Sequence, residues 1–278
     1  MRAWNEAERS IVKTYRKELW ARFVRAISEY DMIQEGDVIA CCISGGKDSM
    51  LMAKLFQELK RHGKIDFDVK YIVMDPGYNE ANRNKIIENA KKLEIPIEIF
   101  PARIFSYVTT LQKNPCFICA RMRRGHLYRI AQENGCNKIA LGHHFDDVIE
   151  TILMGMFYAG QYQTMMPKLH SDNYEGMELI RPLYLIREAD VLRWCKHNDL
   201  SFIRCACKFT EDDEVEHFSK RKEIKDLIAQ LHEVNPYVEK NIFKSSANVN
   251  IGQIISYFDK EKSYHFLDTY DDEEKKYE

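Results

Sequence analysis

A polar segment with two adjacent glycines, at residues 44–49, carries the strongest chemical signal in this 278-residue sequence. It reads S-G-G-K-D-S and follows the apolar run at residues 38–43, which is short enough for a buried parallel strand. A helical apolar pattern begins at Lys47. A strand that turns into a helix through glycines points backbone N–H groups and the positive helix end at one spot. The segment therefore predicts an anion-binding turn, with an ordinary glycine-containing helix start as the weaker alternative.

The same segment resembles the pyrophosphate loop of ATP pyrophosphatases, which cleave ATP between its α and β phosphates. Its spacing is not that of the Walker loop, which has four residues between its glycines. A second segment, G-H-H-F-D-D at residues 142–147, resembles the second motif of that group. The resemblance assigns nucleotide binding to Ser44, Gly45, Gly46, Lys47, Asp48, Ser49, Met74, Gly142 and Asp147.

Three of these residues, Lys47, Asp48 and Asp147, are the catalytic residues that the resemblance implies. Carboxylates at a helix start can hold a metal ion that is bound to phosphates, and Asp147 is the expected Mg²⁺ ligand. Asp146 is its rival for that role. Taken alone, Asp146 fits an ordinary helix N-cap equally well.

Eight cysteines in a chain expected to be cytoplasmic predict ligands rather than a disulfide framework, because the cytosol keeps thiols reduced. Cys116 and Cys119 form C-x-x-C, and Cys205 and Cys207 are the candidate partners. Four thiolates would make a closed, structural zinc site. Three would leave one iron of a 4Fe-4S cluster open for chemistry. The remaining cysteines are assigned to packing: Cys41, Cys42, Cys136 and Cys195.

Further motifs extend the resemblance over residues 31–207. The run C-F-I-C-A-R-M-R-R-G-H-L-Y at 116–128, M-M-P-K-L at 165–169 and I-R-P-L at 180–183 are similar to the tRNA 2-thiocytidine synthetase family. That family is an ATP-dependent, 4Fe-4S tRNA thiolase, so the resemblance implies ATP, Mg²⁺ and a cluster as cofactors. The implied cluster ligands are Cys116, Cys119 and Cys205, with Cys207 as a neighbour.

The reaction that this resemblance implies has two stages. ATP adenylates the C2 carbonyl oxygen of a tRNA pyrimidine, and sulfide held on the cluster then displaces AMP. A sulfur donor such as a cysteine desulfurase is the expected partner, and a homodimer is left open. We predict one continuous pocket, with the cluster within about 10 Å of the α-phosphate so that base and sulfide can meet.

Strand and helix patterns alternate around these motifs. Strands are predicted at 38–43, 69–74, 95–100, 137–141, 178–182 and 200–204. The alternation predicts an α/β fold with a Rossmann-like parallel sheet and helices on both faces, and ligands gather beyond the carboxyl ends of such strands. The resemblance places this sheet among the adenine nucleotide alpha hydrolases.

Three regions follow from the pattern. Residues 1–32 contain one long amphipathic helix at 6–30, and residues 33–210 form the PP-loop ATP pyrophosphatase domain with the iron-sulfur site. Residues 162–178 are expected to be a long polar loop. Residues 211–278 form a helical appendage, with helices at 211–233 and 236–246 and an acidic tail.

Composition sets limits on the partners. A formal net charge of -2 does not indicate a nucleic-acid binder, so any RNA contact must come from local basic patches. Arg121, Arg123, Arg124 and Lys168 are the candidates, although a solvated helix face explains each about equally well. No apolar run approaches the roughly 20 residues of a membrane span, and the charged N-terminus is unlike a secretion signal. We expect a cytoplasmic protein without a membrane partner.

Other functions stay open. Residues 75–79 and the crossover after Phe100 depart from the thiocytidine enzymes, so the modified base is uncertain. The related tRNA thiouridine enzymes carry terminal zinc ribbons, and this chain lacks the C-x-x-C pairs that they need. An ATP-dependent ligase on a small molecule and a nucleotide-binding iron-sulfur or zinc sensor without catalysis are the remaining alternatives.

Overall fold

The computed structural model describes residues 6–63, 65–102, 104–108, 115–203, 220–259 and 261–270. The chain forms two compact units, residues 1–227 and residues 228–278. Within the described ranges, no helix is both long enough and apolar enough to cross a membrane.

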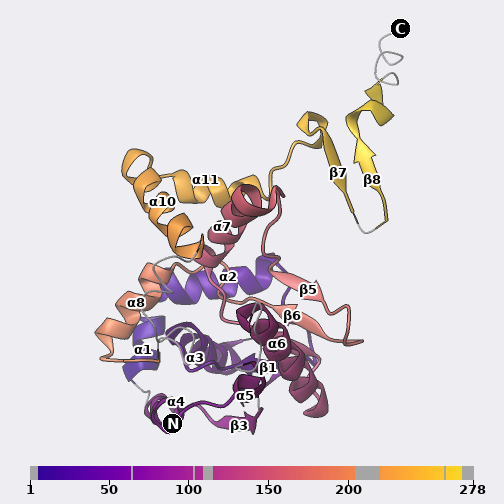
Figure 1. Cartoon of the computed structure of the whole chain (residues 1–278). Helices are drawn as coiled ribbons and strands as arrows, with labels where there is room; N and C mark the ends of the chain where they lie inside the picture. Colours follow the sequence, from indigo (N-terminus) through magenta and orange to yellow (C-terminus); the bar gives the residue numbers. More distant parts are fainter. Residues whose placement is uncertain are drawn as a thin grey trace. The chain divides into compact units, whose positions relative to one another are not determined.

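A six-stranded sheet forms the centre of the first unit (Figure 1), in the order β3-β2-β1-β4-β6-β5. Five neighbouring strands are parallel: β1 (Val38–Cys42), β2 (Asp68–Asp75), β3 (Ile97–Pro101), β4 (Lys138–Ala140) and β6 (Glu178–Ile180). Only β5 (Lys168–His170) runs antiparallel, at the edge. The predicted α/β fold with a parallel sheet is confirmed.

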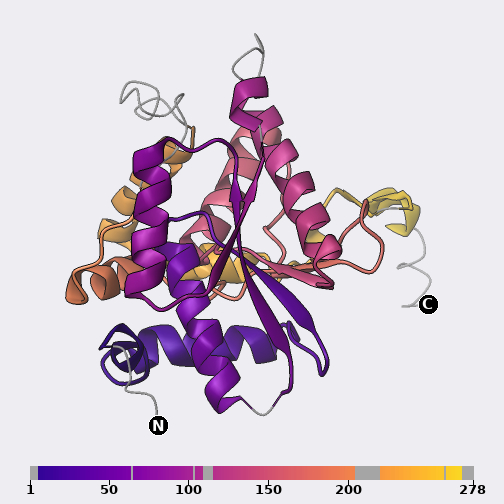
Figure 2. The ribbon, with the colours of Figure 1, turned by 90° about the horizontal axis from the view of Figure 1, so that it is seen from below.

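Helices cover both faces of this sheet. α3 (Lys47–His62) and α4 (Glu80–Lys92) lie on one face, and α6 (Pro115–Glu133) lies on the other (Figure 2). The unit contains three further helices: α5 (Ile104–Val108), α7 (Phe145–Met154), which continues into a π-helical turn at Gly155–Ala159, and α8 (Glu188–His197). Because both faces are covered, β1 is apolar along its length, and Ile39, Ala40 and Cys41 are fully buried.

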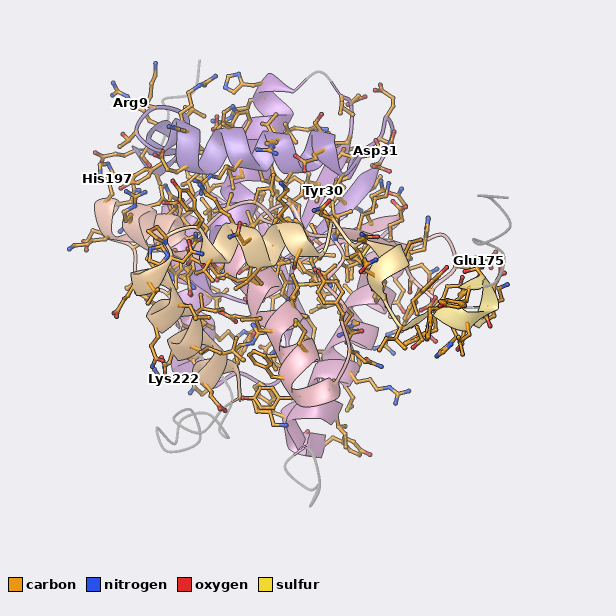
Figure 3. The ribbon with its side chains drawn as sticks, turned by 90° about the horizontal axis from the view of Figure 1, so that it is seen from above. Arg9, Tyr30, Asp31, Glu175, His197 and Lys222 are labelled. Atoms are coloured by element: carbon orange, nitrogen blue, oxygen red, sulfur yellow. The ribbon has the colours of Figure 1, made fainter. Side chains whose placement is uncertain are left out.

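The N-terminal region is not the single helix that the sequence predicted. It consists of α1 (Glu6–Val12), a π-helical turn at Arg16–Trp20 and α2 (Ala21–Glu29), which ends just before the labelled Tyr30 and Asp31 (Figure 3). Tyr15 N–H donates to Ser10 O at 2.8 Å, one residue further back than in an α-helix. This wider turn lets the Tyr15 hydroxyl donate to Arg193 O of α8 at 3.1 Å, so a long-range contact overrides the local repeat.

Two other local predictions were wrong. The polar segment at 162–178 contains β5, which pairs with β6. Residues 200–203 form no strand. Their backbone runs beside α4 instead, where Asn89 Nδ2 donates to Ser201 O at 2.9 Å and Lys92 Nζ donates to Asp199 O at 2.7 Å. Side chains of α4 therefore donate hydrogen bonds to backbone carbonyls that would bond to a neighbouring strand in a sheet.

The C-terminal region is only partly helical. It contains α10 (Lys220–Val234), α11 (Val238–Ser245) and 3₁₀ turns at Ile251–Gln253 and Phe266–Asp268. It also contains a hairpin of β7 (Ser256–Phe258) and β8 (Ser263–His265), which the prediction of a helical appendage missed. Tyr257 and Tyr264 stack across it with ring centroids 4.6 Å apart. Two three-residue strands are too short to show a period of two in the sequence. The predicted helix start at 211 lies outside the described residues.

Candidate functional site

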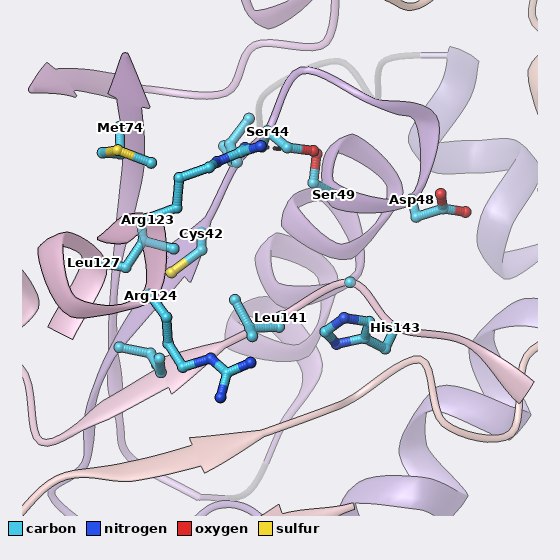
Figure 4. A pocket seen from close by; sticks show the side chains of 13 residues that line it. Cys42, Ser44, Asp48, Ser49, Met74, Arg123, Arg124, Leu127, Leu141 and His143 are labelled. Carbon is cyan, nitrogen blue, oxygen red and sulfur yellow. Dashed lines mark hydrogen bonds between the residues drawn. The ribbon is translucent and has the colours of Figure 1, made fainter. Parts of the chain in front are cut away.

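A pocket of about 330 Å³ lies at the carboxyl ends of the parallel strands (Figure 4). Its walls come from β1, the glycine loop, β2, α6 and β4, and include Cys42, Ser44, Asp48, Ser49, Met74, Arg123, Arg124, Leu127, Leu141, Gly142 and His143. Of the residues predicted to bind the nucleotide, five line this pocket, at the edge of the sheet expected for parallel strands: Ser44, Asp48, Ser49, Met74 and Gly142. The others are not among its lining residues: Gly45, Gly46, Lys47 and Asp147.

The loop between β1 and α3 holds its shape with its own serines. Ser49 Oγ donates to Gly46 O at 2.9 Å and lies 3.2 Å from Ser44 Oγ. Gly45 has a φ of +85°, and a Cβ there would lie 2.5 Å from Ile86 Cγ1. Only glycine fits this position, both because of its backbone conformation and because of its packing. The loop therefore presents the start of the 16-residue helix α3 to the pocket.

Lys47 is held between two carboxylates at the first turn of α3. Its Nζ lies 3.1 Å from Asp48 Oδ2 and 2.9 Å from Glu188 Oε1, at the start of α8. Burial alone would lower the pKa of Lys47, but Asp48 and Glu188 outweigh it and raise that pKa. Lys47 therefore stays a cation at neutral pH, which is the state needed to stabilise a phosphate.

Asp48 has one oxygen without a donor. Its Oδ1 is buried and accepts no hydrogen bond from the described residues, and His144 Nε2 lies 3.9 Å away. Burial raises the pKa of Asp48, and Lys47 and His144 offset part of this rise. A buried oxygen without a donor needs an explanation, and an absent cation is one. Asp48 thus fits a Mg²⁺ ligand on the ground of its own environment.

The turn after β4 is packed directly on α3. A Cβ on Gly142 would lie 3.2 Å from Ser49 N and 3.3 Å from Asp48 C, so glycine permits this close approach. His144 then caps α7, because Asp147 N donates to its Nδ1 at 3.4 Å while His144 N donates to Asp147 Oδ2 at 2.9 Å.

The two aspartates after this turn have different partners. Asp146 Oδ2 accepts a hydrogen bond from Glu188 N at 2.7 Å, and its Oδ1 lies 3.1 Å from Arg187 Nη2. Asp146 therefore anchors the start of α8. Asp147 uses Oδ2 in the cap and Oδ1 in an ion pair with Arg221 Nη1 at 2.7 Å. Within the described residues, no three His, Cys, Asp or Glu side chains are grouped as a metal site.

Comparison with known proteins agrees with this geometry. The family described as "PP-loop domain" matches residues 16–231. A tRNA-cytidine(32) 2-sulfurtransferase from Coxiella burnetii is 35% identical over 251 residues, which are 88% of this chain and 94% of the relative. The same enzyme from Geobacter metallireducens is 32% identical over 228 residues, 81% of this chain and 87% of the relative. This chain belongs to the PP-loop tRNA-cytidine 2-sulfurtransferase family.

The fold has a known structural neighbour as well. The U34-tRNA thiolase NcsA from Methanococcus maripaludis, determined with its 4Fe-4S cluster, superposes with a TM-score of 0.62 at 22% identity. The match covers 82% of this chain and 76% of NcsA. At this identity the likeness shows a shared fold, and the family membership rests on the sulfurtransferase relatives.

Two cations of α10 also approach the site, although the sequence motifs did not point to them. Arg221 pairs with Asp147, and Lys225 Nζ lies 3.1 Å from Glu188 Oε2 and 3.6 Å from Glu150 Oε1. Two cations thus approach the sulfurtransferase loop from a helix about 170 residues later in the chain. The spacing of 147 and 150 on α7, and of 221 and 225 on α10, puts each pair on one helix face. That spacing was the available signal.

Glu188 and Glu150 have different pKa values because their cationic partners differ. Burial acts to raise the pKa of Glu188, but hydrogen bonds from Lys47 and Lys225 lower it to about 2. Burial raises the pKa of Glu150 to about 7, since Lys225 and Arg221 compensate only in part. Glu188 is therefore ionised at neutral pH, whereas Glu150 titrates near neutral pH.

The other end of the pocket is cationic. Arg123 and Arg124 project from α6 into the pocket, where Arg123 extends toward the loop (Figure 4). Arg181 Nε donates to His143 Nδ1 at 3.3 Å, and its Nη1 donates to Met166 O. Burial next to Arg181 lowers the pKa of His143 to about 4. Arg181 of the I-R-P-L motif thus contacts the G-H-H motif through His143 and the M-M-P-K-L motif through Met166. Lys168 Nζ, by contrast, donates to Asp31 O at 2.8 Å.

One predicted thiolate ligand can be placed. Cys119 is buried in the same core cluster as Cys42 and Met74, which line the pocket. The side chain of Cys116 and all of Cys205 and Cys207 lie outside the described residues. The four cysteines assigned to packing are buried: Cys41, Cys42, Cys136 and Cys195.

Proposed function

We propose that this chain is an ATP-dependent tRNA sulfurtransferase that replaces the C2 oxygen of a cytidine with sulfur. The observation that carries the proposal is the composition of one pocket. The glycine loop, the Gly142 turn and α6, the helix that bears Cys116 and Cys119, all line it. The candidate anion site therefore adjoins the helix that carries two of the predicted thiolate ligands, which supports sulfur transfer, the activity in the relatives' names.

ATP would bind with its phosphates on the loop. The start of α3 and the Lys47 ammonium would stabilise the charge that develops as pyrophosphate leaves. Gly142 would allow the nucleotide to lie close to the turn after β4. The Tyr78 hydroxyl donates to Ser44 O at 3.2 Å, which ties the turn after β2 to the loop.

Mg²⁺ would be held by carboxylates of this site together with phosphate oxygens, since this ion keeps few protein ligands. Asp48 is the better supported ligand because its Oδ1 lacks a donor. Asp147 stays a prediction, and Arg221 competes for its Oδ1. In Asp146, both oxygens serve α8, which supports a structural role.

A 4Fe-4S cluster would be held by Cys116, Cys119 and Cys205, and when bound it supplies the sulfide that replaces oxygen. Ile203, two residues before Cys205 in the sequence, lies beside the loop, because a Cβ on Gly45 would be 2.8 Å from its Cδ1. This contact supports Cys205 as the third ligand.

The remaining partners follow from the chemistry. The acceptor would be tRNA, and a sulfur donor such as a cysteine desulfurase would restore the sulfide after each turnover. Reduced thiols at a cluster site favour a cytoplasmic location.

Two measurements test this function. Anaerobically purified protein should contain about four iron and four sulfide per chain, the composition of the cluster. Replacing Cys116, Cys119 or Cys205 by Ser should remove them, whereas replacing Cys136 or Cys195 should not. Stoichiometric zinc without labile sulfide would overturn the cluster assignment. Loss of iron and sulfide in Cys207→Ser but not in Cys205→Ser would overturn the choice of third ligand.

The second measurement is mass spectrometry of tRNA nucleosides from cells with and without the gene. We expect 2-thiocytidine to disappear and to return with the wild-type chain but not with Lys47→Ala. A full complement of 2-thiocytidine without the gene would contradict the proposed acceptor.

A further inference from the structure

A second pocket, of about 510 Å³, lies between α6 and the loop that joins β5 to β6. Its walls include Arg121, Arg124, Tyr128, Ser171, Asn173 and Tyr174. None of the predicted nucleotide or cluster ligands lines it. It is therefore a separate cavity, and it needs its own explanation.

The two walls of this pocket, α6 and the loop, are joined by direct contacts. Tyr128 of α6 and Tyr174 of the loop stack with ring centroids 5.0 Å apart and an interplanar angle of 9°. The Tyr174 hydroxyl donates to Gly125 O at 2.9 Å, and Tyr174 N donates to Ser171 Oγ at 3.2 Å. Aromatic stacking and the hydrogen bond to Gly125 thus fasten the loop to the helix, and the bond to Ser171 fixes the shape of the loop itself.

The two arginines of this pocket lack carboxylate partners. Arg121 and Arg124 form no ion pair with any carboxylate in the part of the chain that the structure describes, and both are exposed. Arg187, Arg193 and Arg221 are paired, by contrast. Two adjacent guanidinium groups without anions make a strong site for phosphate, which they can bind in a bidentate way.

Arg124 also lines the nucleotide pocket, so the two cavities adjoin at this side chain. A ligand that occupies both pockets would place a phosphate next to Arg124. Single-stranded RNA suits this arrangement, because proteins read splayed nucleotides one at a time, with polar groups on base edges and cations on phosphates. A free mononucleotide or phosphate ion would use only the arginines.

We propose that this second pocket holds the nucleotide next to the cytidine being modified, with its phosphate on Arg121 and Arg124. Asn173 and Ser171 offer donors and acceptors to the edge of its base or to its ribose. The inference rests on the proposed function and deepens it, because it assigns a neighbouring-nucleotide site to the same tRNA. The pocket then helps to hold the target base in the reaction pocket.

The test uses the full-length protein and a fluorescently labelled tRNA stem-loop whose loop contains the target cytidine. Arg121→Ala and Asn173→Ala should each weaken its binding, roughly tenfold for Arg121→Ala, the scale of one charge-assisted hydrogen bond. The salt dependence for Arg121→Ala should lose about 0.7 in log–log slope, as expected for one single-strand phosphate contact. Binding of ATP in the absence of RNA, followed with a fluorescent analogue, should not change in either variant.

Arg129→Ala is the matched control. Arg129 is exposed on the same helix, but it pairs with Glu133 at 4.0 Å and lines neither pocket. If Arg129→Ala weakens RNA binding as much as Arg121→Ala does, only a diffuse helix charge acts and the pocket assignment fails. Equal RNA binding by wild type, Arg121→Ala and Asn173→Ala would also overturn it.

Two further outcomes distinguish a failure of this second site from a failure of the proposed function. Inorganic phosphate or AMP that competes fully with the stem-loop in the wild type, but not in Arg121→Ala, would identify a phosphate or mononucleotide site and refute the RNA assignment. A wild-type protein that binds ATP but neither binds nor thiolates the stem-loop would instead refute the proposed function itself. Thermal unfolding of each variant shows whether a loss of binding reflects a loss of folding.

Discussion

The loop end of the candidate site, whose cations lie beside the pocket, and the α6 end, whose arginines line the pocket, carry positive charge in opposite ways. At the loop end, Lys47, Arg221 and Lys225 each contact at least one carboxylate. At the α6 end, Arg123 and Arg124 have no carboxylate partner among the described residues. Paired cations are fixed in position and nearly neutral at a distance, whereas unpaired cations are free to attract an incoming polyanion. Under the proposed function, the first end would serve the chemistry of one phosphate group and the second would bind RNA.

This contrast also reconciles the net charge of -2 with the tRNA substrate that we propose. Acids near the loop pair with its cations. Arg121, Arg123 and Arg124 of α6 have no carboxylate partner among the described residues, so a local positive field remains around them. Net charge alone would have placed the protein outside the nucleic-acid binders.

The largest effect is expected from Lys47→Ala, which removes the cation at the centre of the loop end. AMP formation should fall by about 10²–10³-fold, the usual loss for one group that stabilises transition-state charge. Lys60→Ala, on the last turn of the same helix, should leave it unchanged. An unaltered rate of AMP formation in Lys47→Ala would remove the basis for the nucleotide site.

Glu188→Gln tests how firmly the loop end is tied together. The pKa of Glu188 is lowered from 4.5 to about 2, so its ionised form stabilises the fold above pH 4.5. That stabilisation is lost as the pH falls toward 2. Chemical denaturation should show the variant less stable by on the order of 2–3 kcal/mol at pH 7, with a smaller difference at pH 3.5. A difference that does not vary with pH would show that the ion pairs are not its source.

Arg123→Ala and Arg221→Ala sharpen the comparison directly. Removing the unpaired Arg123 should reduce the log–log salt slope of tRNA binding by about 0.7–0.9 and weaken binding several-fold. Removing Arg221, which Asp147 already neutralises, should leave that slope unchanged. Equal slopes in the two variants, measured by anisotropy between low and moderate salt, would erase the distinction between the two ends.

Glu150→Gln is expected to have the smallest effect, and in the opposite direction from Glu188→Gln. Burial raises the pKa of Glu150 from 4.5 to about 7, so the wild-type fold loses stability as the pH rises through that interval. The neutral variant avoids this loss and should gain on the order of 1 kcal/mol relative to the wild type between pH 5 and pH 7.5. Denaturation curves at the two pH values check this. A variant that is less stable at the higher pH would mean that the pairs with Arg221 and Lys225 outweigh burial.

Much of the nucleotide end could be predicted from the sequence because its signals are local. The run from β1 through S-G-G-K-D-S to α3 combines a buried strand, a glycine turn and a helix start within 25 residues. Alternating strands and helices then require a parallel sheet, and a parallel sheet brings Gly142 and Met74 to the edge where the loop lies. These steps need no knowledge of any distant contact.

The tertiary structure alone decided which groups those local pieces meet. Glu188 lies 141 residues after Lys47, and Arg221 lies 74 residues after Asp147, yet both pairs are in contact. No periodicity specifies such a partner, because a side chain's neighbours across the sheet depend on how whole elements pack. The same reason separates Asp146 from Asp147, which are equivalent as helix-start carboxylates in the sequence. It also explains the break at Tyr15, where a hydrogen bond to α8 overrides a local helical pattern.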